Sequence, residues 1–150
     1  WTGTSSFAAT TTFTGAVVGS PKFTTGLYSS STGGVGTTHG NVVITHNIGF
    51  IPKFIDIMAV ASSSYVGSRF SQGYATSTVG QYSIGLTDTI GSNAGGFATS
   101  SQEYIINIYS PSAGIFVGKL TALTATTMTI FMDINASQFL SFNLLWKATY

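Results

Sequence analysis

Apolar and polar residues alternate along the C-terminal part of the chain. From Thr126 to Ile134, every even-numbered residue except Thr126 is apolar, and every odd-numbered residue except Phe131 is polar. Between Leu140 and Tyr150 every even-numbered residue is apolar. A period of two is typical of a β-strand that turns one face toward a core. Both segments are therefore predicted to be strands, and the last is the clearest in the chain.

Other segments are apolar on both parities. Between Phe54 and Ala61 only Asp56 is charged, and Tyr104–Tyr109 is interrupted only by Asn107. Such runs predict strands covered on both faces, either inside a sandwich or beneath a neighbouring subunit. Turn-forming residues separate the remaining predicted strands, which are Asn41–His46, Tyr82–Leu86 and Ile115–Leu123.

No segment of helical length keeps apolar residues at the spacing of an amphipathic helix. Six to eight short antiparallel strands joined by loops predict an all-β protein. Its fold is expected to be an antiparallel β-sandwich with jelly-roll-like topology, formed by residues 37–150.

Residues 1–36 differ in composition from the rest. They are rich in Thr, Ser and Gly, with isolated aromatic residues at Phe7, Phe13 and Phe23. This segment is predicted to be an extended, fibre-like arm that buries its aromatic rings against copies of itself or against the next domain. The alternative is a flexible linker. Because the sequence starts at Trp1, we expect it to be a processed or excised piece of a longer chain.

Charged residues make up only 6% of the 150 residues, against about 25% in an ordinary soluble domain. The 23 Thr and 20 Ser supply most of the polar surface. Five scattered basic residues form no basic face, so nucleic-acid binding is not expected. No stretch approaches the roughly 18–20 apolar residues of a membrane-spanning helix, so membrane insertion is not expected. A net charge of +1 favours self-association.

Residues able to carry catalysis or bind a metal are few. There is no Cys, and His39 and His46 lack a third ligand at metal-binding spacing. His46 is predicted to be a hydrogen-bonded histidine at the edge of the core. We expect no metal and no cofactor.

Four carboxylates are the only candidates for acid–base chemistry. Asp88 is predicted to lie in a turn, Asp133 to face outward and Glu103 to open a strand. Asp56 lies in an apolar strand and would need a partner such as Lys53, Arg69 or a hydroxyl. No Gly-x-Ser-x-Gly motif is present. The protein is not expected to be an enzyme.

A candidate binding surface lies between residues 65 and 82. Its proposed ligand-binding residues are Tyr65, Arg69, Tyr74 and Tyr82, set among Ser, Gly and Gln. Aromatic faces beside neutral hydrogen-bonding groups suit a sugar, and the same residue types suit a protein interface. The structural alternative is that these tyrosines cover the edge of the sandwich.

Several motifs resemble those of a known family. The segment Thr45–Ile57, T-H-N-I-G-F-I-P-K-F-I-D-I, resembles the T-H-x-L-G-x-x-P-K-F segment of modules near the C-terminus of tailed-bacteriophage tail-fibre and virion-surface proteins. The resemblance covers residues 37–150, and there is a looser likeness to H-type lectins. The further matching segments follow in the same order, and are Phe70–Tyr74, Tyr104–Tyr109, Thr126–Ile130 and Trp146–Ala148.

This resemblance implies a non-enzymatic structural protein on the extracellular surface of a virion. Its expected partners are copies of itself, as a homo-oligomer and usually a trimer, other virion proteins and host-surface polysaccharide. The Gly- and Ser-rich segment Asp88–Ser101 departs from the family and leaves receptor binding open. The alternatives are a capsid decoration or head-fibre protein without receptor function, and a free-standing carbohydrate-binding lectin.

Overall fold

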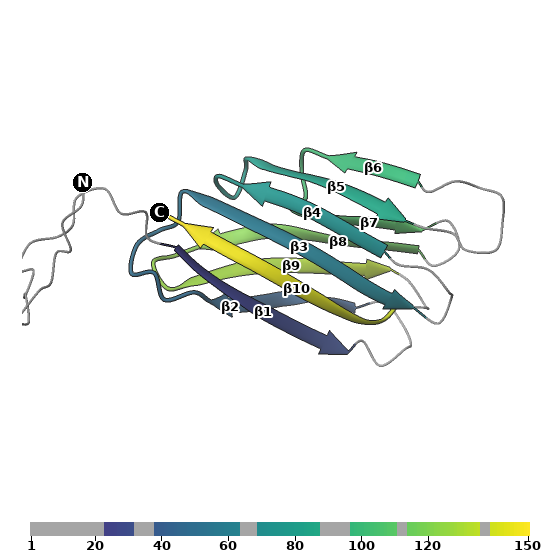
Figure 1. The fold of residues 1–150 in the computed structure, drawn as a ribbon, viewed down its shortest axis with the longest axis horizontal. Coiled ribbons are helices and arrows are strands. Elements are labelled where there is room, and N and C mark those ends of the chain that lie inside the picture. The colour runs from purple at the N-terminus through teal and green to yellow at the C-terminus, as the bar shows by residue number, and fades with distance from the viewer. Residues whose placement is uncertain (1–22, 32–37, 64–68, 88–96, 111–113, 136–138) are drawn as a thin grey trace, which may run out of the picture.

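In a computed structural model, the chain forms ten strands in two antiparallel sheets (Figure 1). The structure describes residues 23–31, 38–63, 69–87, 97–110, 114–135 and 139–150. The strands are β1 (Phe23–Ser31), β2 (Thr38–Thr45), β3 (Phe54–Ser63), β4 (Arg69–Ala75), β5 (Gln81–Thr87), β6 (Phe97–Ser101), β7 (Ile106–Ser110), β8 (Gly114–Leu123), β9 (Thr127–Asn135) and β10 (Phe139–Thr149).

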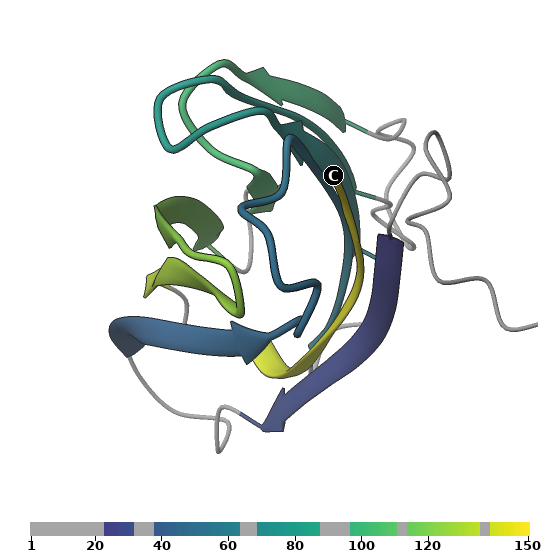
Figure 2. The ribbon, with the colours of Figure 1, turned by 90° about the vertical axis from the view of Figure 1, so that its left-hand side faces the viewer.

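One sheet has six strands in the order β1-β10-β3-β4-β5-β6, and the other has four in the order β2-β9-β8-β7. Most neighbouring strands in the sheets also follow one another in the sequence, in the meanders β3–β6 and β7–β9. The chain crosses between the sheets before and after β2, before β7 and before β10. Figure 2 shows the sheets as two facing layers. This is the all-β sandwich that the sequence predicts.

The core lies between the layers, and in β9 and β10 it follows the alternation of apolar and polar residues. In β5 the parity is reversed, because Gln81 and Ser83 are buried whereas the apolar Ile84 is exposed. In β10 the even-numbered residues Phe142, Leu144, Trp146 and Ala148 are buried. In β9 the even-numbered residues from Met128 to Ile134 are buried in the same way. The inward parity predicted for these two segments is therefore confirmed.

The two layers are joined by hydrogen bonds as well as by apolar packing. The buried Gln81 side chain, from β5, donates through Nε2 to the Leu120 carbonyl at 2.8 Å. Its Oε1 accepts from the Leu120 N–H at 2.7 Å. The register of β8 against β9 shifts between Leu120 and Ala122. Gln81 thus satisfies both backbone groups of Leu120 where the β8–β9 register is irregular.

A second junction depends on a glycine. A Cβ at Gly73, in β4, would lie 1.9 Å from the carbonyl oxygen of Ile105, directly before β7. Nearby, the Asn107 N–H donates to the Ser71 hydroxyl at 2.9 Å. The chain can therefore cross closely over β4 only because residue 73 has no side chain.

The predicted boundary at residue 37 needs correction. Phe23–Ser31 pairs with β10 along nine residues and forms an edge strand of the six-stranded sheet. At Gly26 the absence of a side chain leaves room for the Trp146 indole. This part of the expected arm therefore belongs to the sandwich, because β10 offers it a free backbone edge. Residues 1–22, with Phe7 and Phe13, lie outside the described residues.

The prediction for Phe54–Ala61 was half correct. The odd-numbered side chains of β3, such as Ile55 and Ile57, are fully buried. Its even-numbered apolar side chains, Phe54, Met58 and Val60, are exposed. The single chain thus covers one face of this central strand and leaves the other open. Strands β1, β4 and β6 were not predicted.

Candidate interaction surface

The side of the six-stranded sheet that faces away from the core, here called the outer face, carries large exposed apolar side chains. Leu27 is 64% exposed, Ile84 58% and Leu145 51%. The outer face spans the five neighbouring strands β1, β10, β3, β4 and β5. Its exposed large apolar and aromatic residues are Phe23, Leu27, Phe54, Met58, Val60, Tyr74, Tyr82, Ile84, Leu86 and Leu145.

The strand registers place these residues in rows across the sheet. One row, here called the apolar row, runs Leu27, Leu145, Met58, Gln72 and Ile84 from β1 to β5. Directly opposite residues on one face of a sheet have Cβ atoms about 4.5–5.5 Å apart. The apolar row therefore presents an almost continuous strip of apolar side chains, interrupted only by the neutral amide of Gln72.

The adjacent row, here called the polar row, runs Thr25, Lys147, Asp56, Tyr74 and Tyr82 across the same strands. Asp56 and Lys147 are the only acidic and basic side chains in these two rows. They are direct register partners on β3 and β10. Two opposite charges thus lie side by side near the middle of the outer face.

Three aromatic rings stack at one side of the outer face. The Tyr74 ring centroid lies 5.7 Å from that of Phe54 and 5.1 Å from that of Tyr82. The interplanar angles are 18° and 26°. Tyr74 therefore has an aromatic neighbour on each side, in offset-stacked geometry.

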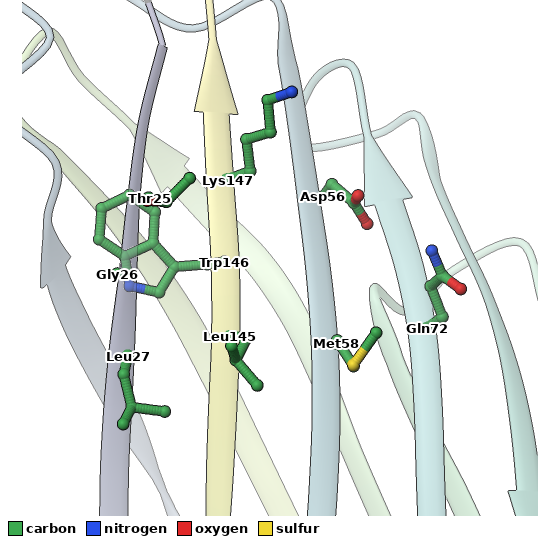
Figure 3. A pocket seen from close by; sticks show the side chains of 9 residues that line it. All are labelled: Thr25, Gly26, Leu27, Asp56, Met58, Gln72, Leu145, Trp146 and Lys147. Atoms are coloured by element: carbon green, nitrogen blue, oxygen red, sulfur yellow. The ribbon is translucent and has the colours of Figure 1, made fainter.

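Two shallow hollows lie on the outer face and share Asp56 and Gln72 in their linings. The first, of about 340 Å³, lies above β1, β10, β3 and β4 and includes Leu27 and Trp146 (Figure 3). The second, of about 360 Å³, lies beside the aromatic stack. Together they form a continuous depression that follows the two rows.

Neither charge in this depression has an ionic partner within the described residues. The ion pairs among the described residues are Lys119–Glu103 at 2.9 Å and His39–Asp133 at 2.8 Å. Lys119, His39 and Asp133 belong to the four-stranded sheet, on the other side of the sandwich. Lys147 Nζ instead lies 5.1 Å from the Phe23 ring centroid. Figure 3 shows the Lys147 and Asp56 side chains extending from neighbouring strands on the same face.

The structure brings two of the four predicted ligand-binding residues together. Tyr74 and Tyr82 are register partners on the outer face. Tyr65 lies outside the described residues.

The predicted ligand-binding role of Arg69 needs correction, because this residue is only 1% exposed and lies on the core side of β4. Tyr74 lies five positions after Arg69, and an odd number of positions along a strand places two side chains on opposite faces. Burial lowers the pKa of the Arg69 guanidinium below its ordinary value. Arg69 therefore cannot anchor a ligand on the outer face.

The expectation of a buried, partnered Asp56 was also wrong. Asp56 is half-buried on the outer face and lines both hollows. Lys53, one suggested partner, lies 4.6 Å from the Tyr150 ring centroid instead. Among the residues that the structure describes, no second carboxylate of the kind that a paired acid–base site needs lines either hollow.

The two histidines behave as structural residues. His46 is 3% exposed, and its Nδ1 accepts a hydrogen bond from the Ile48 N–H at 3.3 Å. This confirms the predicted hydrogen-bonded histidine at the edge of the core. His39 contacts Asp133, which faces outward as predicted. Within the described ranges, no group of three His, Asp or Glu side chains is placed to hold a metal ion.

Sequence reasoning missed the apolar row. Leu27 belonged to the expected arm, and Leu145 fell at an outward position of the last predicted strand. Ile84 lies on the apolar parity of Tyr82–Leu86, which alternation assigns to the core but the structure turns outward. A signal was present, because Phe54–Ala61 is apolar on both parities and Leu145 breaks the alternation of the last strand. Both features place apolar side chains on the face opposite the core.

No helix capable of crossing a membrane occurs among the residues that the structure describes. Comparison with family models, with curated proteins and with solved structures finds no match to this chain.

Proposed function

We propose that this chain is a non-enzymatic structural module of a tailed-bacteriophage virion, exposed on its surface as part of a tail fibre or a related appendage. It works by contact, assembling with copies of itself and with other virion proteins. The observation that carries the proposal is the outer face, which exposes apolar side chains over five neighbouring strands with one acidic and one basic group in its two central rows.

The size of this surface supports an assembly function. Five strands spaced about 4.8 Å apart, each about eight residues long at about 3.3 Å per residue, present roughly 600 Å² in projection. Monomeric soluble proteins rarely expose contiguous apolar patches larger than a few hundred Å², and larger ones mark interaction sites. Protein partners therefore account for this face better than solvent does.

The family resemblance supports the virion setting and a trimeric assembly. Its longest motif, Thr45–Ile57, forms the crossing from β2 to β3, where Asn47 and Gly49 have φ of 51° and 82°. The N–H groups of His46 and Gly49 donate to the carbonyls of Thr126 and Ala125. These residues fix a turn that the sandwich needs, so this part of the motif argues for a shared fold. Phe54 and Asp56, near the end of the motif, lie on the outer face.

Attachment to host-surface polysaccharide is a second candidate function. It is favoured by the hollow of about 360 Å³, in which Tyr74 and Tyr82 lie near Asp56 and Gln72. A sugar packs its C–H face on the flat face of an aromatic ring, but Tyr74 is flanked on both sides by other rings. A sugar would have to compete with these neighbouring rings for the faces of Tyr74, which favours a protein partner.

The virion proposal is tested by labelling particles. An antibody raised against the purified chain is applied to virions from the source of the sequence and viewed by negative-stain electron microscopy. Label at a regular position on the tail or head supports the proposal, and particles without label contradict it. Pre-absorbing the antibody with the purified chain is the control.

Two assays test the rival functions on the same protein. A glycan array that gives binding to the full chain, lost in Tyr74→Ala with the fold intact, would support polysaccharide attachment. A blank array would favour a purely structural role. Release of reducing sugar that disappears in Asp56→Asn would establish an enzyme, and we expect no release.

A further inference from the structure

We infer that the outer face packs against the outer face of neighbouring copies of this chain, with Asp56 of each copy opposite Lys147 of another. This inference rests on the proposed assembly function and names its contact surface. The partner on the outer face is thus a second copy of the chain, and the Asp56 and Lys147 side chains set its register.

The first argument is charge complementarity. Asp56 and Lys147 are adjacent on β3 and β10, carry opposite charges, and have no ionic partner within the described part of the chain. A surface that carries one acid beside one base is complementary to a copy of itself. In a two-fold dimer a contact from residue i to residue j is matched by the contact from j to i, and in a trimer each copy repeats the same contact to the next copy. Each Asp56 can therefore meet a Lys147 in either assembly.

The second argument is the contrast between the two sides of the sandwich. On the four-stranded side, Lys119 pairs with Glu103, and His39 contacts Asp133, within the same chain. On the outer face the Ser29 hydroxyl donates to Asn143 at 2.6 Å, and Lys147 Nζ lies over the Phe23 ring. Asp56 and Lys147 thus have no ionic partner within the described part of the chain and are surrounded by exposed apolar side chains.

The third argument is area. The projected face of roughly 600 Å² approaches the roughly 800 Å² that each partner contributes to a stable interface. At its centre Met58 and Leu145 are register partners on adjacent strands and both are exposed. Their contact with the same residues of another copy would complete the two-sided burial of β3 that its sequence predicts.

The competing occupant is a polysaccharide chain lying along the depression. The Tyr74 ring is flanked by Phe54 and Tyr82, so a sugar would have to compete with these rings for its faces. The most exposed residues of the apolar row, Leu27 and Ile84, also have no hydrogen-bonding group to offer hydroxyls. We therefore treat sugar binding as an outcome of the test.

The test measures the mass of the full chain by light scattering after size-exclusion chromatography, across a concentration series. We expect a particle of two or three chains. Asp56→Lys and Lys147→Asp, each alone, are expected to weaken association about tenfold or more, because each places like charges in contact. The matched control is Lys119→Asp, which reverses an exposed charge on the other side of the sandwich and is expected to leave the mass unchanged.

Two combinations complete the charge-reversal test, and the second separates contact between copies from effects within one chain. The double variant Asp56→Lys with Lys147→Asp restores the complementary pair and is expected to associate like the original chain. An equimolar mixture of the two single variants is expected to associate more tightly than either alone. If a single reversal fails to fold by circular dichroism, Asp56→Asn and Lys147→Gln test the same contact with a smaller expected effect.

A full chain that stays monomeric overturns the inference, as do single reversals that leave association unchanged. A monomeric chain that nevertheless labels virions overturns this interface alone and leaves the proposed function standing. A monomeric chain that binds glycans, and loses them in Asp56→Lys, assigns the outer face to polysaccharide.

Discussion

At the scale of single residues, strand parity decides which side chains reach solvent. Arg69 and Tyr74 are close in sequence, yet one lies in the core and the other on the outer face. Sequence reasoning grouped them because it treated residues 65–82 as one loop-like surface. Once Arg69–Ala75 is known to be a strand, the alternation of its burial separates them without further information.

Gln81 shows the same dependence on position. We expect Gln81→Met to lower the free energy of unfolding by about 2–4 kcal/mol, because it leaves the buried N–H and carbonyl of Leu120 without partners. Urea denaturation followed by circular dichroism measures this. Gln72→Met, on the outer face, is the matched control and should change unfolding by less than about 0.5 kcal/mol. Equal effects for both would contradict the structural role of Gln81.

At the scale of elements, the sequence predicted the strands whose two faces differ and missed those whose signal is weak. β9 and β10 alternate clearly, and their inward parity was confirmed. β1 contains Gly26 and several hydroxyl residues, so it has little apolar pattern of its own. It forms because the backbone of β10 offers it a pairing edge, a tertiary effect that a local pattern does not carry.

The close crossing over β4 can be tested with a pair of glycines. Gly73→Ala is expected to destabilise the fold by about 3 kcal/mol, because its Cβ would meet the Ile105 carbonyl and force the chain before β7 to move. Gly40→Ala, in β2, has nothing within 4 Å of the added Cβ and should be neutral or slightly stabilising. Thermal melting by circular dichroism compares the two. A harmless Gly73→Ala would argue against this crossing.

The place of β1 can be tested with two truncations. Removing residues 1–22 leaves β1 intact and should preserve cooperative unfolding. Removing residues 1–36 also deletes β1, strips the edge of β10 and uncovers Trp146, so the melting temperature should fall by several degrees or the protein should aggregate. If both truncations behave alike, β1 contributes nothing to the sandwich.

At the scale of the whole molecule, the described residues form ion pairs on the four-stranded side, whereas exposed apolar side chains surround the adjacent Asp56 and Lys147 on the outer face. The fold class followed from alternation and composition, because these reflect burial in any β-sandwich. The outer face did not, because it depends on which strands become neighbours. Strand order placed Leu27, Leu145 and Met58 in one row although they are distant in sequence.

This asymmetry predicts how association responds to salt. Because most of the outer face is apolar, raising sodium chloride to about 1 M should leave self-association intact or weaken it only slightly, through screening of the Asp56–Lys147 contact. Ammonium sulfate should strengthen association, because excluded salts favour burial of apolar surface. Sedimentation velocity at several salt concentrations measures both. Dissociation in sodium chloride would indicate an interface dominated by charge.

The bare backbone at Gly26 leaves the Trp146 indole near the floor of the first hollow. Trp1 is the only other tryptophan in the sequence. A Trp1→Phe variant would thus turn Trp146 into an intrinsic optical sensor placed under the outer face. Its fluorescence should become less accessible to acrylamide as the chain concentration rises, so that occupancy of this face could be followed without attaching a dye.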